Sequence, residues 1–168
     1  MVAVRFHGRG GQGAKTASRI LGTAAFVSGY VAQDSPIYGA ERRGAPVAAF
    51  TRFGRDPIRE RGAITYPDVI VVADASLLED EAAHVLDGMD DQTVLFVNSS
   101  LSTDALRAHR SLPEQMTVKD VTGIALQQLG QREAMSALLG AVAARLVGLE
   151  WEPVRLAITR ELDDLGLA

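Results

Sequence analysis

Residues 2–13 read VAVRFHGRGGQG, which joins a β-prone run over 2–6 to a glycine-rich turn over 8–13. Small and apolar residues then recur at helical spacing from Ala14 to Val27, and Gly29 is placed to end that helix. A strand, a glycine turn and a helix are therefore predicted to open the chain. This order is typical of α/β proteins that bind an anion at the first turn.

Predicted strands and helices alternate along the rest of the chain. Residues 69–72 form a nearly continuous apolar run, VIVV, of the kind found in strands that are covered on both faces. Ser76 and Glu79 have capping-box spacing, which predicts a helix that reaches about Leu86. Further strands are expected at 30–33, 47–53, 68–73, 93–98 and 117–121. An ordered loop is expected over 34–46, a turn at 54–57, a short helix beyond Ser102, a helix over 133–146 and a last helix from near Pro153.

This alternation predicts an α/β fold in a single domain over residues 1–168, a three-layer sandwich with a mostly parallel, Rossmann-like sheet. Leu138, Leu139, Val142 and Leu146 are expected to form the buried face of the helix over 133–146. Ligands of such sheets bind beyond the carboxyl ends of the strands. In this chain those ends carry the glycine turn, Asp74 and Asn98.

Composition excludes several functions for this chain on its own. With 47% hydrophobic and 23% charged residues in 168, the chain is globular rather than disordered, collagen-like or coiled-coil. It contains no cysteine, so it cannot supply disulfides, cysteine ligands for iron–sulfur clusters or a cysteine nucleophile. A net charge of −4 gives no general reason to expect nucleic-acid or membrane binding. No leader peptide or membrane-spanning stretch is recognised, so a cytoplasmic location is expected.

Gly8, Gly10 and Gly13 match the dinucleotide-binding pattern G-x-G-x-x-G, and Asp34 follows about 20 residues later. The glycines would let the backbone approach a pyrophosphate, and the acidic side chain would bind a ribose hydroxyl. Alternatively, the turn packs the first helix against the sheet, or presents its amides to another anion or a partner protein. The chain is short for a separate substrate domain, and Asp34 precedes Ser35 and Pro36, as a turn residue would. A phosphate-binding P-loop would need lysine where Ala14 stands.

A second unusual segment is YGAERRGAP over residues 38–46, in which Arg42 and Arg43 are adjacent. Two guanidinium groups on a shaped loop can bind phosphate or carboxylate, although the segment by itself favours a salt bridge within the loop that involves Glu41. Asp74 could serve as an acid, a base or a ribose ligand, but an acidic residue just before a helix more often interacts with the amides of that helix, and Asn98 is similarly ambiguous. The three histidines have no metal-ligand spacing, and no catalytic residue or metal site is predicted on this chain.

Several motifs together resemble the gamma subunit, or gamma domain, of the 2-oxoacid:acceptor oxidoreductases, the pyruvate:ferredoxin oxidoreductase family. They are GRGGQG at 8–13, ERRGAP at 41–46, the strand over 68–73 with its DASLL ending at 74–78, and LLGA at 138–141. The resemblance covers nearly the whole chain. The first two motifs are specific in combination and in this order, whereas neither is specific alone.

The resemblance implies a subunit of an enzyme that decarboxylates a 2-oxoacid on thiamine diphosphate, passes two electrons through iron–sulfur clusters to an acceptor such as ferredoxin, and transfers the acyl group to coenzyme A. Thiamine diphosphate and the clusters would be held by alpha, beta and delta-type partner subunits. The gamma domain would contribute to coenzyme A binding and assembly. Substrate choice is expected on other chains, because nothing here recognises an aliphatic or aromatic 2-oxoacid side chain.

The residues that the resemblance assigns to coenzyme A are Arg9, Gly10, Gly11, Gln12 and Gly13 of the glycine turn, and the arginine pair Arg42 and Arg43. The glycine turn would supply amides or a polar contact, and the arginines would bind phosphate or substrate charge. Two alternatives remain open. One is a stand-alone regulatory module that binds NAD or FAD, and the other is a purely structural subunit whose arginine loop makes salt bridges between subunits.

Overall fold

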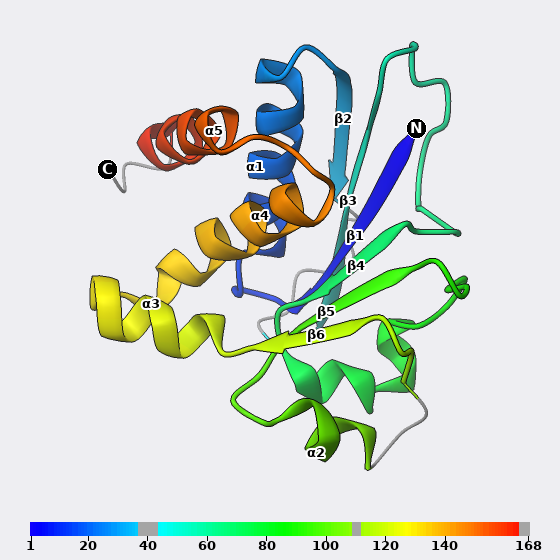
Figure 1. The fold of residues 1–168 in the computed structure, drawn as a ribbon, viewed down its shortest axis with the longest axis vertical. Coiled ribbons are helices and arrows are strands. Elements are labelled where there is room, and N and C mark those ends of the chain that lie inside the picture. Colours follow the sequence, from blue (N-terminus) through cyan, green and yellow to red (C-terminus); the bar gives the residue numbers. More distant parts are fainter. Residues whose placement is uncertain (37–43, 109–111, 165–168) are drawn as a thin grey trace.

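The computed structural model describes residues 1–36, 44–108 and 112–164, whose strands form one sheet in the order β2-β3-β1-β4-β5-β6 (Figure 1). The neighbours β1, β4, β5 and β6 run parallel, whereas β3 is antiparallel to both β1 and β2. An α/β fold with a mostly parallel sheet is thus confirmed. The strands are β1 (Val2–Arg9), β2 (Val31–Pro36), β3 (Pro46–Gly54), β4 (Val69–Val72), β5 (Val94–Asn98) and β6 (Met116–Lys119).

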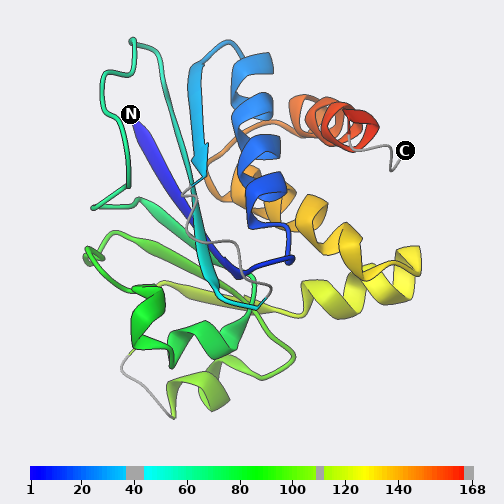
Figure 2. The same ribbon diagram turned by 180° about the vertical axis from the view of Figure 1, so that it is seen from behind.

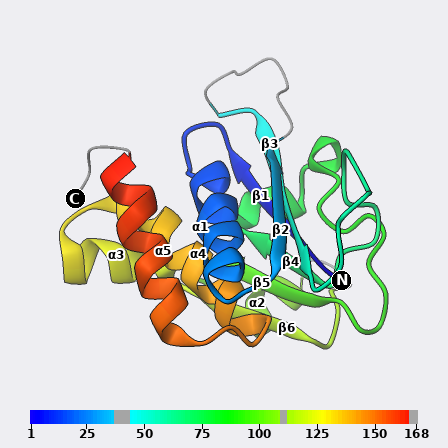
Figure 3. The same ribbon diagram turned by 90° about the horizontal axis from the view of Figure 1, so that it is seen from above.

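Helical layers lie on both faces of the sheet (Figures 2 and 3). One layer contains α1 (Ala14–Val27), α4 (Met135–Leu146) and α5 (Trp151–Asp164), with α3 (Val121–Leu129) and the 3-10 helix η3 (Arg132–Ala134) next to α4. The other layer contains the short helices η1 (Ala75–Leu78), η2 (Glu81–Ala83) and α2 (Thr103–Arg107). The arrangement is the expected sandwich, with longer helices on one side than on the other.

The alternation of side chains along the strands builds a core on each face. Val4, Phe6 and Val71 pack with α1 and α4, whereas Ile70 and Val72 pack with Leu77, Leu78 and Val85 of the opposite layer. All four residues of β4 are buried, which explains why this strand carries apolar side chains without interruption.

Two predicted elements differ from the structure at their ends. The second strand begins at Val31 and runs to Pro36, so Asp34 lies within β2, opposite Thr51 of β3, rather than after the strand. Because β2 is an edge strand, polar residues fit it, and a prediction based on apolar content stops too early. The loop expected over 34–46 is shorter at both ends, since Pro46 belongs to β3. Residues 37–43 are outside the described part of the chain.

The helix predicted from Ser76 to about Leu86 is instead two 3-10 helices. Asp74, rather than Ser76, caps η1 by accepting the Ser76 amide, and Asp80 caps η2 by accepting the Ala82 amide. A second capping aspartate inside the segment ends one helix and starts the next. His84 then adopts a left-handed conformation with φ 48°, which ends η2.

The segment after β6 contains a helix that was not predicted. Val121, placed in the strand expected over 117–121, instead begins α3, and Asp120 caps it by accepting the Gly123 amide. The prediction of a helix near 133–146 holds as α4, but its buried face differs. Leu139 is buried and Leu138 and Val142 are partly buried, whereas Leu146 is exposed. Small residues of α4 take the core positions, because α4 lies very close to α1.

Candidate functional site

The glycine turn lies at the carboxyl end of β1 and leads directly into α1. Gly13 is the N-cap residue of α1 and has a left-handed backbone, with φ 75° and ψ 20°. Neither a side-chain cap nor an acidic residue occupies the first turn of this helix. No side chain of this turn neutralises the partial positive charge of the helix N-terminus, so this end of the helix can bind an anion.

Gly13 is also required by packing. A Cβ atom at this position would lie 2.4 Å from Cβ of Ser136, at the start of α4. Two Cβ atoms cannot lie so close together, so any larger residue at position 13 would force the helices apart. Gly140 of α4 is similarly close to Ile20 of α1, since a Cβ added to Gly140 would lie only 2.8 Å from Ile20 Cγ2. The glycines of the motif and of α4 thus allow α1 and α4 to approach closely. The sequence offered packing of the first helix against the sheet as an alternative role of the turn, but the neighbour that requires glycine at position 13 is α4.

The amides of the turn divide into two groups. Gly10 N donates to Ala45 O (2.9 Å) and Gln12 N donates to Arg9 O (2.9 Å), so these two are used within the chain. Among the described residues, the amides of Gly11 and Gly13 meet no hydrogen-bond acceptor. Gly11 is exposed, has φ 93°, and has open space around it. Gly11 and Gly13 are therefore the members of the turn whose amides can donate to a phosphate.

The side chain of Gln12 connects the turn to the end of β4. Its Oε1 accepts the Arg9 amide (2.7 Å) and its Nε2 donates to Asp74 Oδ2 (2.8 Å). Burial alone would raise the pKa of Asp74, but hydrogen bonds from Gln12 and Ser76 outweigh it and hold that pKa below its ordinary value. Asp74 is thus a carboxylate near neutral pH. Its expected interaction with helix amides is confirmed by its bond to the Ser76 amide.

A cavity of about 400 Å³ lies beyond the carboxyl ends of β4 and β5, next to the glycine turn. Gln12, Asp74, Asp120, Thr122 and Arg132 contribute polar groups to its wall. Asn98 also lines this cavity, yet its side chain serves the fold. Its Nδ2 donates to Ala73 O, and its Oδ1 accepts the amides of Val121 and Thr122.

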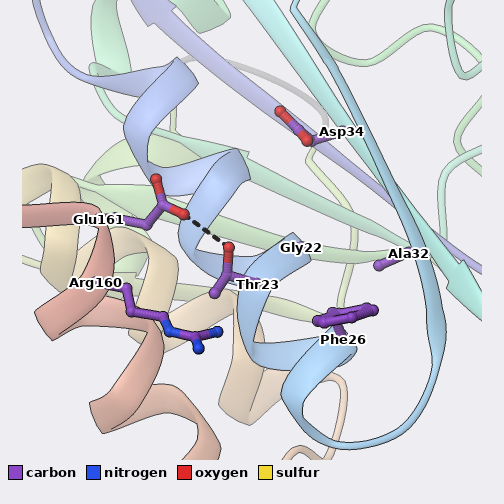
Figure 4. A pocket seen from close by; sticks show the side chains of 7 residues that line it. All are labelled: Gly22, Thr23, Phe26, Ala32, Asp34, Arg160 and Glu161. Atoms are coloured by element: carbon purple, nitrogen blue, oxygen red, sulfur yellow. Dashed lines mark hydrogen bonds between the residues drawn. The ribbon is translucent and has the colours of Figure 1, made fainter. Parts of the chain in front are cut away.

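Asp34 lies at a different cavity, which α1, β2 and α5 enclose (Figure 4). Gly22, Thr23 and Phe26 of α1 form one wall of this space of about 440 Å³, and Glu161 of α5 points toward Thr23. Glu161 accepts a hydrogen bond from Thr23 Oγ1 (2.7 Å) and pairs with Arg19 (2.8 Å). Because β3 separates β2 from β1, Asp34 is two strands away from the turn that a bound dinucleotide would touch.

Buried polar residues that sequence reasoning did not single out lie on the other face of the sheet. Arg5 donates to the carbonyls of Ile64 (3.3 Å) and Val85 (2.7 Å), and its Nε is buried without a partner in the described structure. His7, two residues further along β1, is 4% exposed. Burial, assisted by the charge of Arg5, lowers the pKa of His7 to about 4, so this histidine is neutral. The only sequence signal was their alternation with Val4 and Phe6.

Arg42 and Arg43 lie outside the described residues, so the structure brings together only Arg9, Gly10, Gly11, Gln12 and Gly13 of the predicted site. In the described ranges, no three histidine, cysteine, aspartate or glutamate side chains form a group that could hold a metal ion. Over the same ranges, no helix combines the length and apolar character needed to cross a bilayer.

Comparison with known proteins gives consistent results over nearly the full length. The family model described as pyruvate ferredoxin/flavodoxin oxidoreductase matches residues 3–166. The chain is 45% identical, over 159 residues, to the pyruvate/ketoisovalerate oxidoreductases common subunit gamma of Pyrococcus furiosus, covering 94% of this chain and 85% of that protein. It is 40% identical, over 146 residues, to pyruvate synthase subunit PorC of Thermotoga maritima, covering 87% and 74%.

The fold agrees with these sequence relationships. The crystal structure of pyruvate oxidoreductase subunit PORC from Thermotoga maritima superimposes with a TM-score of 0.76 at 34% identity, covering 98% of this chain and 84% of that one. The glycine turn, the DASLL segment that follows β4 and forms η1, and the LLGA segment of α4 all fall within the matched range. The chain therefore belongs to the pyruvate ferredoxin/flavodoxin oxidoreductase family.

Proposed function

We propose that this chain is the gamma subunit of a cytoplasmic, thiamine diphosphate-dependent 2-oxoacid:acceptor oxidoreductase that forms acyl-coenzyme A. The observation that carries the proposal is the family match over residues 3–166, together with relatives named as gamma or PorC subunits at 40–45% identity. In this reaction the 2-oxoacid loses carbon dioxide, two electrons pass to an acceptor such as ferredoxin, and the acyl group is transferred to coenzyme A.

The composition of the chain supports placing the cofactors and the recognition of the 2-oxoacid on other subunits. Iron–sulfur clusters are held by cysteine thiolates, and this chain has no cysteine, so the alpha, beta and delta-type partners would hold the clusters and thiamine diphosphate. The name of the Pyrococcus furiosus relative refers to a subunit common to two oxidoreductases that act on different 2-oxoacids. That supports placing the choice of 2-oxoacid on a partner chain here as well.

The proposed contribution of this chain is to coenzyme A binding, through the turn over residues 9–13 and the pair Arg42 and Arg43. Support comes from the uncapped N-terminus of α1 and from the amides of Gly11 and Gly13, which are available among the described residues. Backbone amides at a helix start bind one pyrophosphate as readily as another. The G-x-G-x-x-G pattern then indicates phosphate binding without specifying NAD or FAD.

The first experiment isolates the native complex through a tag on this chain. Larger chains should copurify, together with thiamine diphosphate, iron and labile sulfide. An active enzyme consisting of this chain alone, or a cofactor-free homodimer that binds NAD or FAD, would contradict the proposal. Large apolar side chains such as Leu129 and Trp151, which are 57% and 54% exposed, are expected to lose accessibility to partners in the complex.

The second experiment measures coenzyme A affinity in the assembled complex with the double variant Arg42→Ala, Arg43→Ala. Loss of two charged contacts should weaken affinity about tenfold or more. The matched control is Arg55→Ala, Arg59→Ala, which removes the same charge from exposed positions after β3. Unchanged affinity in the first variant would remove the arginine pair from the site. Protection of the pair from arginine-modifying reagents by coenzyme A would separate ligand binding from a purely structural role.

A further inference from the structure

We propose that Arg9 and Asp74 act as a positioning pair, which holds the glycine turn, the residues that lead into β3 and the start of η1 in one arrangement. Arg9 then shapes the coenzyme A site through its neighbours instead of contacting a phosphate. The part of this inference that concerns coenzyme A rests on the proposed function, whereas the coupling between the two side chains does not.

The Arg9 guanidinium binds two segments that are far apart in the sequence. Its Nε and Nη2 both donate to Ser76 Oγ, at 3.2 and 2.9 Å, and its Nη1 donates to Gly44 O at 3.2 Å. Three of the five guanidinium donors are thus used within the chain. This fork geometry is specific to arginine, because the ammonium group of lysine cannot reach both acceptors with fixed, planar donors.

Asp74 completes the network, because it binds both Gln12 and Ser76. Its Oδ2 accepts from Gln12 Nε2 (2.8 Å), and its Oδ1 accepts from the Ser76 amide (3.0 Å) and from Ser76 Oγ (2.7 Å). Gln12 in turn accepts the Arg9 amide through Oε1 (2.7 Å). Arg9, Gln12, Asp74 and Ser76 therefore form a closed ring of hydrogen bonds in which each member holds two others.

Backbone bonds attach a third segment to this ring. Gly10 N donates to Ala45 O (2.9 Å), and Gly44 N donates to Gly10 O (3.3 Å), so the residues before β3 pair with the turn itself. The Arg9 bond to Gly44 O strengthens the same contact. These three segments belong to three of the four family motifs, GRGGQG, ERRGAP and DASLL, and the network brings them together at the carboxyl edge of the sheet.

The charge balance distinguishes a positioning role from a phosphate contact. Two carboxylates, Asp74 and Asp80, each lie 3.7 Å from the Arg9 guanidinium. One positive charge faces two negative charges, so Arg9 offers a polyanion little net attraction. If Arg9 nevertheless contacted a phosphate, removal of the Asp74 charge would strengthen that contact. If Arg9 is a positioning residue, the same substitution would break the ring and weaken binding, so the two roles predict opposite signs.

The experiment measures the KM for coenzyme A and kcat in the assembled complex for Asp74→Asn, Arg9→Ala and the double variant. We expect each single variant to raise the KM about three- to tenfold, with kcat at saturating coenzyme A little changed. The KM of the double variant should be no higher than that of the more impaired single variant, since both substitutions break the same ring. Arg9→Lys should behave like Arg9→Ala. A lower KM in Asp74→Asn, or full retention of affinity in Arg9→Lys, would overturn the inference.

Thermal unfolding of the same complexes supplies a readout that does not depend on coenzyme A. Arg9→Ala and Asp74→Asn should lower the Tm non-additively, whereas additive shifts would refute the pair whatever happens to the KM. The matched control is the exposed pair Glu152→Gln, Arg155→Ala on α5, which should leave the KM unchanged. If Arg42→Ala, Arg43→Ala leaves coenzyme A affinity unchanged, the proposed site loses its arginine pair, whereas the positioning role of Arg9 and Asp74 is still judged by the coupling between their two substitutions.

Discussion

Gly13→Ala tests whether the glycine turn is dictated by helix packing as well as by its backbone conformation. A non-glycine residue at φ 75° costs about 1–2 kcal/mol. The added Cβ would lie 2.4 Å from Ser136 Cβ, and overpacking of this kind costs about 1–3 kcal/mol. Alanine recovers about 0.4–1 kcal/mol by restricting the unfolded chain. Gly13→Ala should therefore lower the free energy of unfolding by about 1–5 kcal/mol, with a central value of about 3 kcal/mol, measured by urea unfolding of the purified chain.

Two comparisons separate the contributions. Gly11→Ala has a similar positive φ of 93° but open space around it, so it should cost only about 1 kcal/mol. In a Ser136→Gly background, the atom that Gly13→Ala would meet is gone, and its cost should fall to about the same 1 kcal/mol. If Gly13→Ala costs no more than Gly11→Ala, or if Ser136→Gly gives no relief, the close approach of α1 and α4 does not select glycine at position 13.

Three further substitutions test buried polar groups. The pKa of His7 is about 4 when folded and near 6.5 when unfolded, so stability should fall by about 3 kcal/mol as the pH drops from about 6.5 to 4. His7→Gln should flatten that profile, and an unchanged slope in this variant would refute the assignment. Asn98→Ala leaves the amides of Val121 and Thr122 without their acceptor and should cost about 2–4 kcal/mol in urea unfolding. Glu161→Gln weakens the ion pair with Arg19, whose side chain is 37% exposed, and should lower the free energy of unfolding by about 1–3 kcal/mol. An unchanged midpoint of urea unfolding would mean that only the hydrogen bond from Thr23 positions Glu161 (Figure 4).

Local patterns predicted the elements whose causes are local. The apolar run over 69–72 became β4 because both faces of that strand are covered, and Asp74 capped the next helix as its residue type indicates. Helix α3 was missed because its first turn, Val121-Thr122-Gly123, has low helix propensity. Its start is stabilised by Asn98, which accepts two of its amides from more than twenty residues away. The hydrophobic periodicity of residues 121–129 cannot reveal that contact, because Asn98 lies outside the segment.

The buried face of α4 was assigned to large residues because the local pattern does not contain the contact that determines it, which is the packing of α4 against α1. Leu146 fits the helical spacing of Leu138 and Leu139, yet the helix turns Ala and Gly toward α1 because the two helices lie so close. The distance between helices is a tertiary property, and the small residues that permit it carry little weight in a hydrophobic pattern. The glycine at position 140 was part of a recognised family motif, but its packing role became visible only with Ile20 beside it.

Strand order explains why a dinucleotide fingerprint can be present without dinucleotide geometry. In a dinucleotide-binding unit, the second strand lies parallel and next to the first, so its terminal acidic residue reaches the ribose of a nucleotide on the glycine turn. Here β3 occupies that place in the antiparallel direction and moves β2 to the sheet edge, where Asp34 faces α1 and α5 instead. Asp74, which follows the parallel neighbour β4, instead binds Gln12 of the glycine turn. The turn therefore keeps amides at Gly11 and Gly13 that meet no acceptor among the described residues, while the acidic residue that would bind a ribose lies two strands away.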